Sequence, residues 1–73
     1  MDLKMYINSF SAEERLLVID YLLKNLKIQK SSLGHWMYGH RNPSPKHALQ
    51  IEKLTIGAVT RYDLRPDIYQ RDG

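Results

Sequence analysis

The chain has no cysteine among its 73 residues, which excludes a disulfide framework and any zinc site built on thiolates. It also lacks a long hydrophobic run, because its two longest apolar stretches, residues 16–19 and 21–23, are separated by Asp20. The N-terminus carries Asp2 and then a helical pattern, which is unlike a signal peptide. We therefore expect a soluble, cytoplasmic protein with no membrane partner.

Motifs of catalysis are missing as well. The chain contains no Gly-x-Ser-x-Gly, no glycine loop for phosphate and no evident pairing of a nucleophile with a base. Its three histidines are spaced by five and seven residues with no adjacent carboxylate, which does not fit a zinc pattern. The pair Asp63 and Asp67 is explained by helix capping and by an ion pair with Arg61 or Arg65. We expect no enzyme activity, no metal, no cofactor and no small-molecule ligand.

Acidic residues are absent from the middle of the chain. None occurs between Asp20 and Glu52, whereas this interval holds five lysines or arginines and all three histidines. Residues 1–23 carry a formal charge of −2 and residues 54–73 carry zero, so the net charge of +3 comes from the middle segment. Such a basic segment is typical of a surface that meets a polyanion, although a solvated face without a partner has the same composition.

The apolar periodicity predicts five short helices and no strand. The first ends near Asn8 or Ser9, and the third covers residues 29–38. Local start signals mark the other three helices. The second helix begins at a capping box in residues 11–14 and runs to about Leu26, and the fourth begins at Ser44-Pro45 and runs to near Gly57. The fifth helix begins at a capping box in residues 60–63, and Pro66 ends it. The expected fold is all-α, a compact five-helix domain over residues 1–73 in which only residues 70–73 are unanchored.

The second helix has two apolar faces. Its predicted core face consists of Ala12, Leu16, Ile19, Leu22, Leu23 and Leu26. A second strip, Leu17 and Tyr21, lies on the other side of a row of charges. We expect the first and last helices to cover this strip, because a small helical domain commonly wraps one central helix. The alternative is a surface for self-association.

The second and third helices are joined by a tight turn at Lys27-Ile28, which is the arrangement of a helix-turn-helix. The two helices of this motif cross closely, so apolar residues are required at fixed offsets on both. In a unit spanning residues 19–38, these buried positions are all apolar: Leu22, Leu26, Ile28, Leu33 and Trp36. An arbitrary amphipathic helix rarely satisfies all five.

Two stretches of the sequence resemble known families. LKIQKSSLGHWMYGHRNPS resembles the helix-turn-helix of the phage Cro and CI repressors, in which L-G-[VI]-S-x-x-x-[VIL]-S-x-W-x-x-G-x-R-x-P-S recurs. The tail LTIGAVTRYDLRPDIY is similar to the C-terminal signature of small Cro-like proteins of the prophage YdaS family. The resemblance covers about residues 19–69 and implies a lambda-repressor-like fold that binds duplex DNA.

Two positions depart from the repressor pattern. Lys27 stands where the turn usually has glycine, and Leu23 stands where close helix crossing usually has alanine. We expect Lys27 either to close the turn without a left-handed residue or to accept the strain of that conformation. The larger Leu23 should hold the two helices slightly apart.

The resemblance also implies a set of DNA contacts, because the recognition helix of such proteins, here residues 29–38, enters the major groove. The implied base contacts are Gln29, Lys30, Ser31, Gly34 and His35. The implied phosphate contacts are Lys27, Ser32, Tyr38, His40, Arg41, Asn42, Lys46 and His47. Glycine costs a helix interior about 1 kcal/mol relative to alanine. We interpret Gly34 as a bare Cα that allows close approach to DNA.

The predicted function is sequence-specific binding of double-stranded DNA by a transcriptional regulator. It is expected to be a Cro-like phage or prophage repressor that occupies a pseudo-palindromic operator as a homodimer. The alternatives are a YdaS-like antitoxin or partner-binding protein that also autoregulates, and a module that binds RNA or a sigma factor. Candidate dimer surfaces are the strip of Leu17 and Tyr21, and the C-terminal segment around Leu64, Ile68 and Tyr69.

Overall fold

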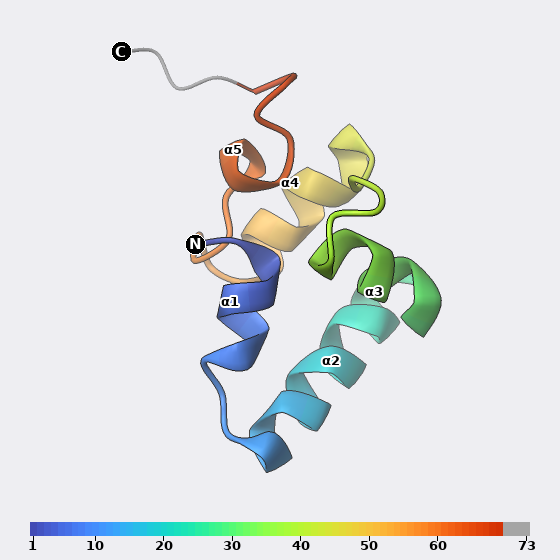
Figure 1. Ribbon diagram of the computed structural model, residues 1–73, viewed down its shortest axis with the longest axis vertical. Coiled ribbons are helices and arrows are strands. Elements are labelled where there is room, and N and C mark those ends of the chain that lie inside the picture. The colour runs from blue at the N-terminus through green and yellow to red at the C-terminus, as the bar shows by residue number, and fades with distance from the viewer. Residues whose placement is uncertain (70–73) are drawn as a thin grey trace.

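The computed structural model of the protein describes residues 1–69 and folds them into α-helices without a β-strand. The elements are α1 (Leu3–Asn8), α2 (Ala12–Leu26), α3 (Lys30–Met37), α4 (Pro45–Leu54) and α5 (Arg61–Leu64). The predicted all-α, five-helix fold is confirmed for this part of the chain. Residues 70–73, which we expected to be unanchored, lie outside the described residues. Figure 1 shows α2 as the longest element, with α4 and α5 at the opposite end of the molecule from its first turns.

Side-chain caps determine where most of these helices begin. The side chains of Asp2, Ser11, Ser44 and Thr60 each accept a hydrogen bond from the backbone N–H three residues further on. Both predicted capping boxes, at residues 11–14 and 60–63, make their two reciprocal bonds. The exception is α3, whose N-cap Gln29 makes no side-chain capping bond. Local chemistry therefore starts four of the five helices described here.

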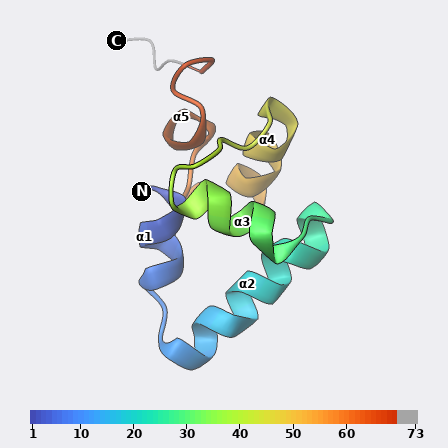
Figure 2. The ribbon, with the colours of Figure 1, turned by 45° about the vertical axis from the view of Figure 1, so that its right-hand side comes forward.

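The core is a single cluster to which every helix of residues 1–69 contributes. Its buried apolar members are Leu3, Ile7, Leu22, Leu26, Leu33, Ala48, Ile51, Val59 and Leu64. Through these side chains α1 packs against α2 and α3, while α4 packs against α2 and α5. Of the five positions predicted to be buried in the helix-turn-helix, three are in this list, and Ile28 and Trp36 are half-buried against it. Figure 2 shows α3 running from beside α1 to the C-terminal end of α2, with α4 above it.

The predicted core face of α2 is right in its C-terminal half and wrong in its N-terminal half. Leu22 and Leu26 are buried, and Ile19 is half-buried. Leu16, however, is 68% exposed, and Ala12 is exposed too. The reason is that the first turns of α2 lie at the far end of the molecule from α4 and α5 (Figure 1), so that few partners are left to bury them.

The second apolar strip of α2 is uncovered, which contradicts our expectation that the first and last helices would shield it. Leu17 is 72% exposed and Tyr21 is 47% exposed. The last helix, α5, packs on α4 rather than on α2, and α1 lies along another side of α2 (Figure 1). The strip is therefore a solvent-facing apolar surface.

Two turns place residues with a Cβ in the left-handed conformation. Lys27 ends α2 with φ 56° and ψ 46°, so the turn that lacks the usual glycine accepts the strain. Ile56 follows α4 with φ 54°. The fourth helix was expected to end near Gly57, but α4 ends at Leu54, because the N–H of Gly57 turns back to the carbonyl of Glu52 at 2.8 Å. The left-handed conformation costs an L-residue roughly 1–2 kcal/mol.

Replacing Ile56 by glycine is expected to stabilise the domain. The Ile56 side chain is 93% exposed, so its removal sacrifices almost no packing while it relieves the left-handed strain. We expect Ile56→Gly to raise the free energy of unfolding by about 0.5–1 kcal/mol after the entropy cost of glycine is subtracted. Urea denaturation measures this difference. Ile56→Ala, which keeps a Cβ, serves as the matched control and should gain less, and a loss of stability in both variants would contradict the strain argument.

Candidate nucleic-acid interface

One side of α3 faces the core and the other faces solvent. Leu33 is buried, while Trp36 and Met37 are half-buried against the core. The residues implied as base contacts lie on the solvent-facing side of α3. We call this set the groove face; it consists of Gln29, Lys30, Ser31, Gly34 and His35. Four of them are exposed and Gly34 is half-buried at the edge. The helix itself covers Lys30–Met37, so Gln29 and Tyr38 are its caps rather than its first and last turns.

The first turn of α3 has unused hydrogen-bond donors. The carbonyl of Gln29 accepts from the amides of Ser32 and Leu33, but no side chain caps this turn. The amides at the start of a helix carry the positive end of its dipole. The side chain of Gln29 makes no capping hydrogen bond, and it is exposed beside these backbone amides. This end of α3 is therefore suited to acceptor groups that come from outside the chain.

Gly34 is not required by packing inside the protein. A Cβ added at this position would have no neighbouring atom of the chain within 4 Å, helix backbone aside. An alanine would thus fit in the free protein, and in a helix interior it would contribute about 1 kcal/mol more than glycine. Neither a close internal contact nor a left-handed turn accounts for this glycine.

The loop after α3 keeps two polar side chains in solvent. Gly39 follows the helix in the left-handed conformation with φ 77°, and the N–H of His40 returns to the carbonyl of His35 at 2.9 Å. The rings of His35 and His40 meet edge to face with centroids 6.1 Å apart. Arg41 and Asn42, both implied as phosphate contacts, are exposed in this loop.

Arg65, which was not among the predicted site residues, holds the loop. Its Nη1 donates to the carbonyl of Pro43 at 2.9 Å, and its Nε and Nη2 donate to the two carboxylate oxygens of Asp67 at 3.0 and 2.9 Å. The hydrogen bond from Arg65 lowers the pKa of Asp67, and the same bond raises the pKa of Arg65. Only the ion pair with Asp67 was predictable, because a bond to a carbonyl 22 residues away leaves no pattern in a sequence.

The two predicted phosphate contacts at the start of α4, Lys46 and His47, have different surroundings. Lys46 is exposed. His47 is half-buried, with its ring 5.3 Å from that of Trp36 and its Nδ1 3.1 Å from the hydroxyl of Ser44. His47 thus supports the back of α3, and its backbone N–H is also bonded to the Ser44 hydroxyl.

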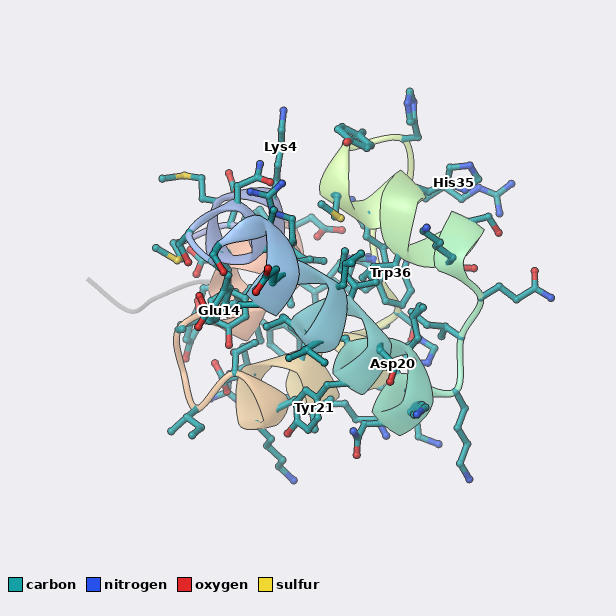
Figure 3. All side chains as sticks on the ribbon, turned by 90° about the horizontal axis from the view of Figure 1, so that it is seen from below. Lys4, Glu14, Asp20, Tyr21, His35 and Trp36 are labelled. Atoms are coloured by element: carbon teal, nitrogen blue, oxygen red, sulfur yellow. The ribbon has the colours of Figure 1, made fainter. Side chains whose placement is uncertain are left out.

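The remaining implied phosphate contacts lie along α3 or at its two ends. Lys27 precedes the helix and is exposed, Ser32 is half-buried, and Tyr38 at the far end is 64% exposed. The amine of Lys4, in α1, lies 5.3 Å from the centre of the Tyr38 ring. Figure 3 shows Lys4 and His35 both projecting from the upper part of that view. Lys4 was not predicted, because nothing in the sequence indicates that α1 reaches the end of α3.

Residues 1–69 contain no group of three or more histidine, aspartate or glutamate side chains placed to hold a metal ion. None of the helices described here combines the length and the hydropathy needed to cross a membrane.

The variant Gly34→Ala tests whether Gly34 is required for DNA binding although it lowers the stability of the helix. We expect the variant to be more stable than the wild type by up to about 1 kcal/mol, because alanine is the better helix former and meets no clash. Urea denaturation measures this gain, and titration with duplex DNA measures the consequence for binding. Weakened binding is expected if the bare Cα admits a partner. Unchanged affinity together with higher stability would show that the glycine is merely tolerated.

Comparison with known proteins gives two matches. A model of the family described as bacterial toxin YdaS matches residues 20–72. A curated relative from Escherichia coli (strain K12), named "Prophage transcriptional regulatory protein", is 47% identical over 34 residues, which are 47% of this chain and 52% of the relative. The chain thus spans about half the length of this relative, and no solved structure matches it significantly. Because the family model covers most of the chain, from the second half of α2 onward, the protein belongs to the bacterial toxin YdaS family, as its C-terminal signature predicted.

Proposed function

We propose that this protein is a transcriptional regulator that binds duplex DNA in a sequence-specific manner, with α3 in the major groove. The observation that carries the proposal is the groove face, an exposed polar surface on a helix with an uncapped start, set in a segment without carboxylates. A relative named as a prophage transcriptional regulatory protein supports the same class of function. A helix that enters the groove N-terminal end first reads base edges with its first residues.

The side chains of the groove face suit different bases. Lys30 can donate to O6 and N7 of guanine, and the amide of Gln29 can pair bidentately with adenine. Ser31 can donate to either a base or a phosphate, and His35 lies one turn further along the same face. A good bidentate pair is worth about 1–3 kcal/mol of discrimination against a wrong base. Sequence preference should therefore originate at the N-terminal end of α3.

Phosphate contacts position this helix without reading sequence. Lys27 lies before α3, and Arg41, Asn42 and Lys46 lie after it, so cationic and amide groups are available at both ends. The bond from Arg65 to the loop carbonyl limits the freedom of Arg41 and Asn42 before DNA arrives. Less entropy is then lost on binding, which favours affinity.

We further propose that two copies bind a pseudo-palindromic operator and pair through the exposed face of α2. Of the C-terminal candidates, Leu64 is buried in the core and cannot take part. Along α2, Glu13 and Lys24 lie at opposite ends of the strip of Leu17 and Tyr21. An antiparallel second copy brings each Glu13 opposite Lys24 of the other copy, which in its own chain also pairs with Asp20 at 3.0 Å. In Figure 3 Tyr21 and His35 point to different sides of the molecule, so this pairing leaves the groove face free.

The pairing is expected to be weak in free solution. A stable interface buries about 800 Å² on each partner, and one strip of a single helix supplies only part of that area. Two adjacent half-sites raise the effective concentration of the second copy. Dimerisation should therefore accompany DNA binding, and a promoter occupied in this way is closed to polymerase.

A second candidate function follows from the description of the family as a toxin. In that case the chain acts in a toxin–antitoxin pair and binds DNA for autoregulation. The deciding observation is growth of cells that express the protein. If inhibition disappears in variants that no longer bind duplex DNA, promoter occupancy explains the toxicity. Inhibition that persists in those variants indicates a separate partner.

Two substitutions test the roles assigned along the interface. Lys30→Ala should reduce the preference for the selected sequence over unrelated duplexes, with a loss of about 1–3 kcal/mol. Arg41→Ala should weaken binding to all duplexes about equally and lower the salt dependence. Fluorescence anisotropy with specific and unrelated duplexes measures both. Lys53→Ala, a change of one exposed charge at the far end of α4, is the control, and exchanged effects of the first two variants would mean that α3 is misplaced in the groove.

The dimer is tested by selection of binding sites from random duplexes. We expect a pseudo-palindrome with half-sites about one helical turn, or a multiple of it, apart. Glu13→Lys should weaken binding to the full site more than binding to a half-site, because it places two lysines opposite each other. Adding Lys24→Glu to that variant should restore the preference for the full site. Selection of single, asymmetric sites would contradict the dimer.

A further inference from the structure

A cleft of about 260 Å³ opens between α1, α2 and the groove-face helix α3. Its apolar floor includes Ile7, Ile19 and Leu33, one from each helix. Arg15 from α2 and Lys30 from α3 contribute its cations, and no carboxylate belongs to the described residues that line it. The cleft therefore combines an apolar floor with positive charge.

Arg15 has hydrogen-bonding capacity that the protein itself does not use. Its Nη2 donates to the carbonyl of Phe10 at a long 3.4 Å, while its Nε is buried and has no hydrogen-bond partner. A buried donor without a partner is unfavourable, so such an atom calls for an explanation. Two carboxylates of α2 that are close to Arg15 in sequence are engaged elsewhere. Glu14 accepts from the Ser11 amide, and Asp20 pairs with Lys24 at 3.0 Å.

The cleft borders the surface that is proposed to meet DNA. Lys30, Gly34 and Tyr38 follow one another at intervals of four residues, so they lie along one side of α3, and all three line the cleft. Lys30 and Gly34 also belong to the groove face. A helix seated in the major groove has a sugar-phosphate strand along each side. In the proposed binding mode, one of these strands passes over the mouth of the cleft, next to the bare Cα of Gly34.

We propose that Arg15, which lines this cleft beside Lys30, binds a backbone phosphate of the duplex at its mouth. The inference rests on the proposed function and adds a binding residue from α2, outside the helix-turn-helix unit of residues 19–38. A guanidinium suits the role, because its planar set of donors matches phosphate oxygens and is less strongly hydrated than an ammonium.

The test compares the salt dependence of duplex binding in the full chain. Arg15→Gln should lower the slope of log Kd against log salt by about 0.9, which amounts to roughly eightfold weaker binding at about 0.1 M salt. Lys53→Gln removes one exposed charge outside the cleft and should leave the slope unchanged. Wild-type protein that fails to bind any duplex overturns the proposed function. Wild-type protein that binds, with an unchanged slope in Arg15→Gln, overturns only the role of Arg15.

A second variant separates a phosphate contact from a structural role, because Arg15 also bonds the Phe10 carbonyl. Arg15→Lys keeps the charge and loses the guanidinium, so it should retain most of the salt slope even where its free energy of unfolding is lower. In the wild type, the Nε–H signal of Arg15 should shift in NMR spectra when duplex is added. An Arg15 Nε–H signal that does not shift contradicts the phosphate contact. So does a salt slope that falls in Arg15→Gln and Arg15→Lys by the same amount as in a destabilised core variant. Binding of an acidic peptide but not of duplex at this cleft would contradict it as well.

Discussion

The packing of α3 on its three neighbours is the constraint on which the rest of this structure depends. A helix of eight residues is not stable by itself in water, and this one also lacks a side-chain cap and contains a glycine. Its stability must therefore come from burying Leu33 and the inner sides of Trp36 and Met37. Each neighbour contributes to that burial, since α1 and α2 lie along one side and His47 of α4 closes the back of Trp36.

The supports of the groove face come from parts of the chain that are remote in sequence. Arg65, beyond α5, bonds the loop that presents Arg41 and Asn42, and Lys4 of α1 reaches the ring of Tyr38. The short α5 is held in turn by its capping box and by the N-terminal amine, which pairs with Asp63 at 3.2 Å. In a domain of this size there is little surplus stability, so the same contacts that build the fold also fix the geometry of the site.

The family assignment and the geometry address different questions. The match of residues 20–72 places the chain in the bacterial toxin YdaS family, and a curated relative is named as a prophage regulator. Those names come from other proteins, whereas the residues of the groove face, the exposed strip of α2 and the unpartnered Nε of Arg15 are properties of this chain. A regulator that occupies DNA is consistent with both names, because occupancy of a promoter can itself impair growth.

The sequence by itself determined where helices start, and it predicted the helix-turn-helix and the family. Capping boxes, Ser44-Pro45 and the apolar spacing act within three or four residues, so their outcome is visible without the fold. Only the tertiary structure decided that Leu16, Leu17 and Tyr21 face solvent, because exposure depends on how far α1, α4 and α5 extend over α2. It also decided that Arg65 reaches Pro43 and that Arg15 lines a cleft beside α3. These contacts join segments that approach one another only after the core has formed, and no local pattern encodes such an approach.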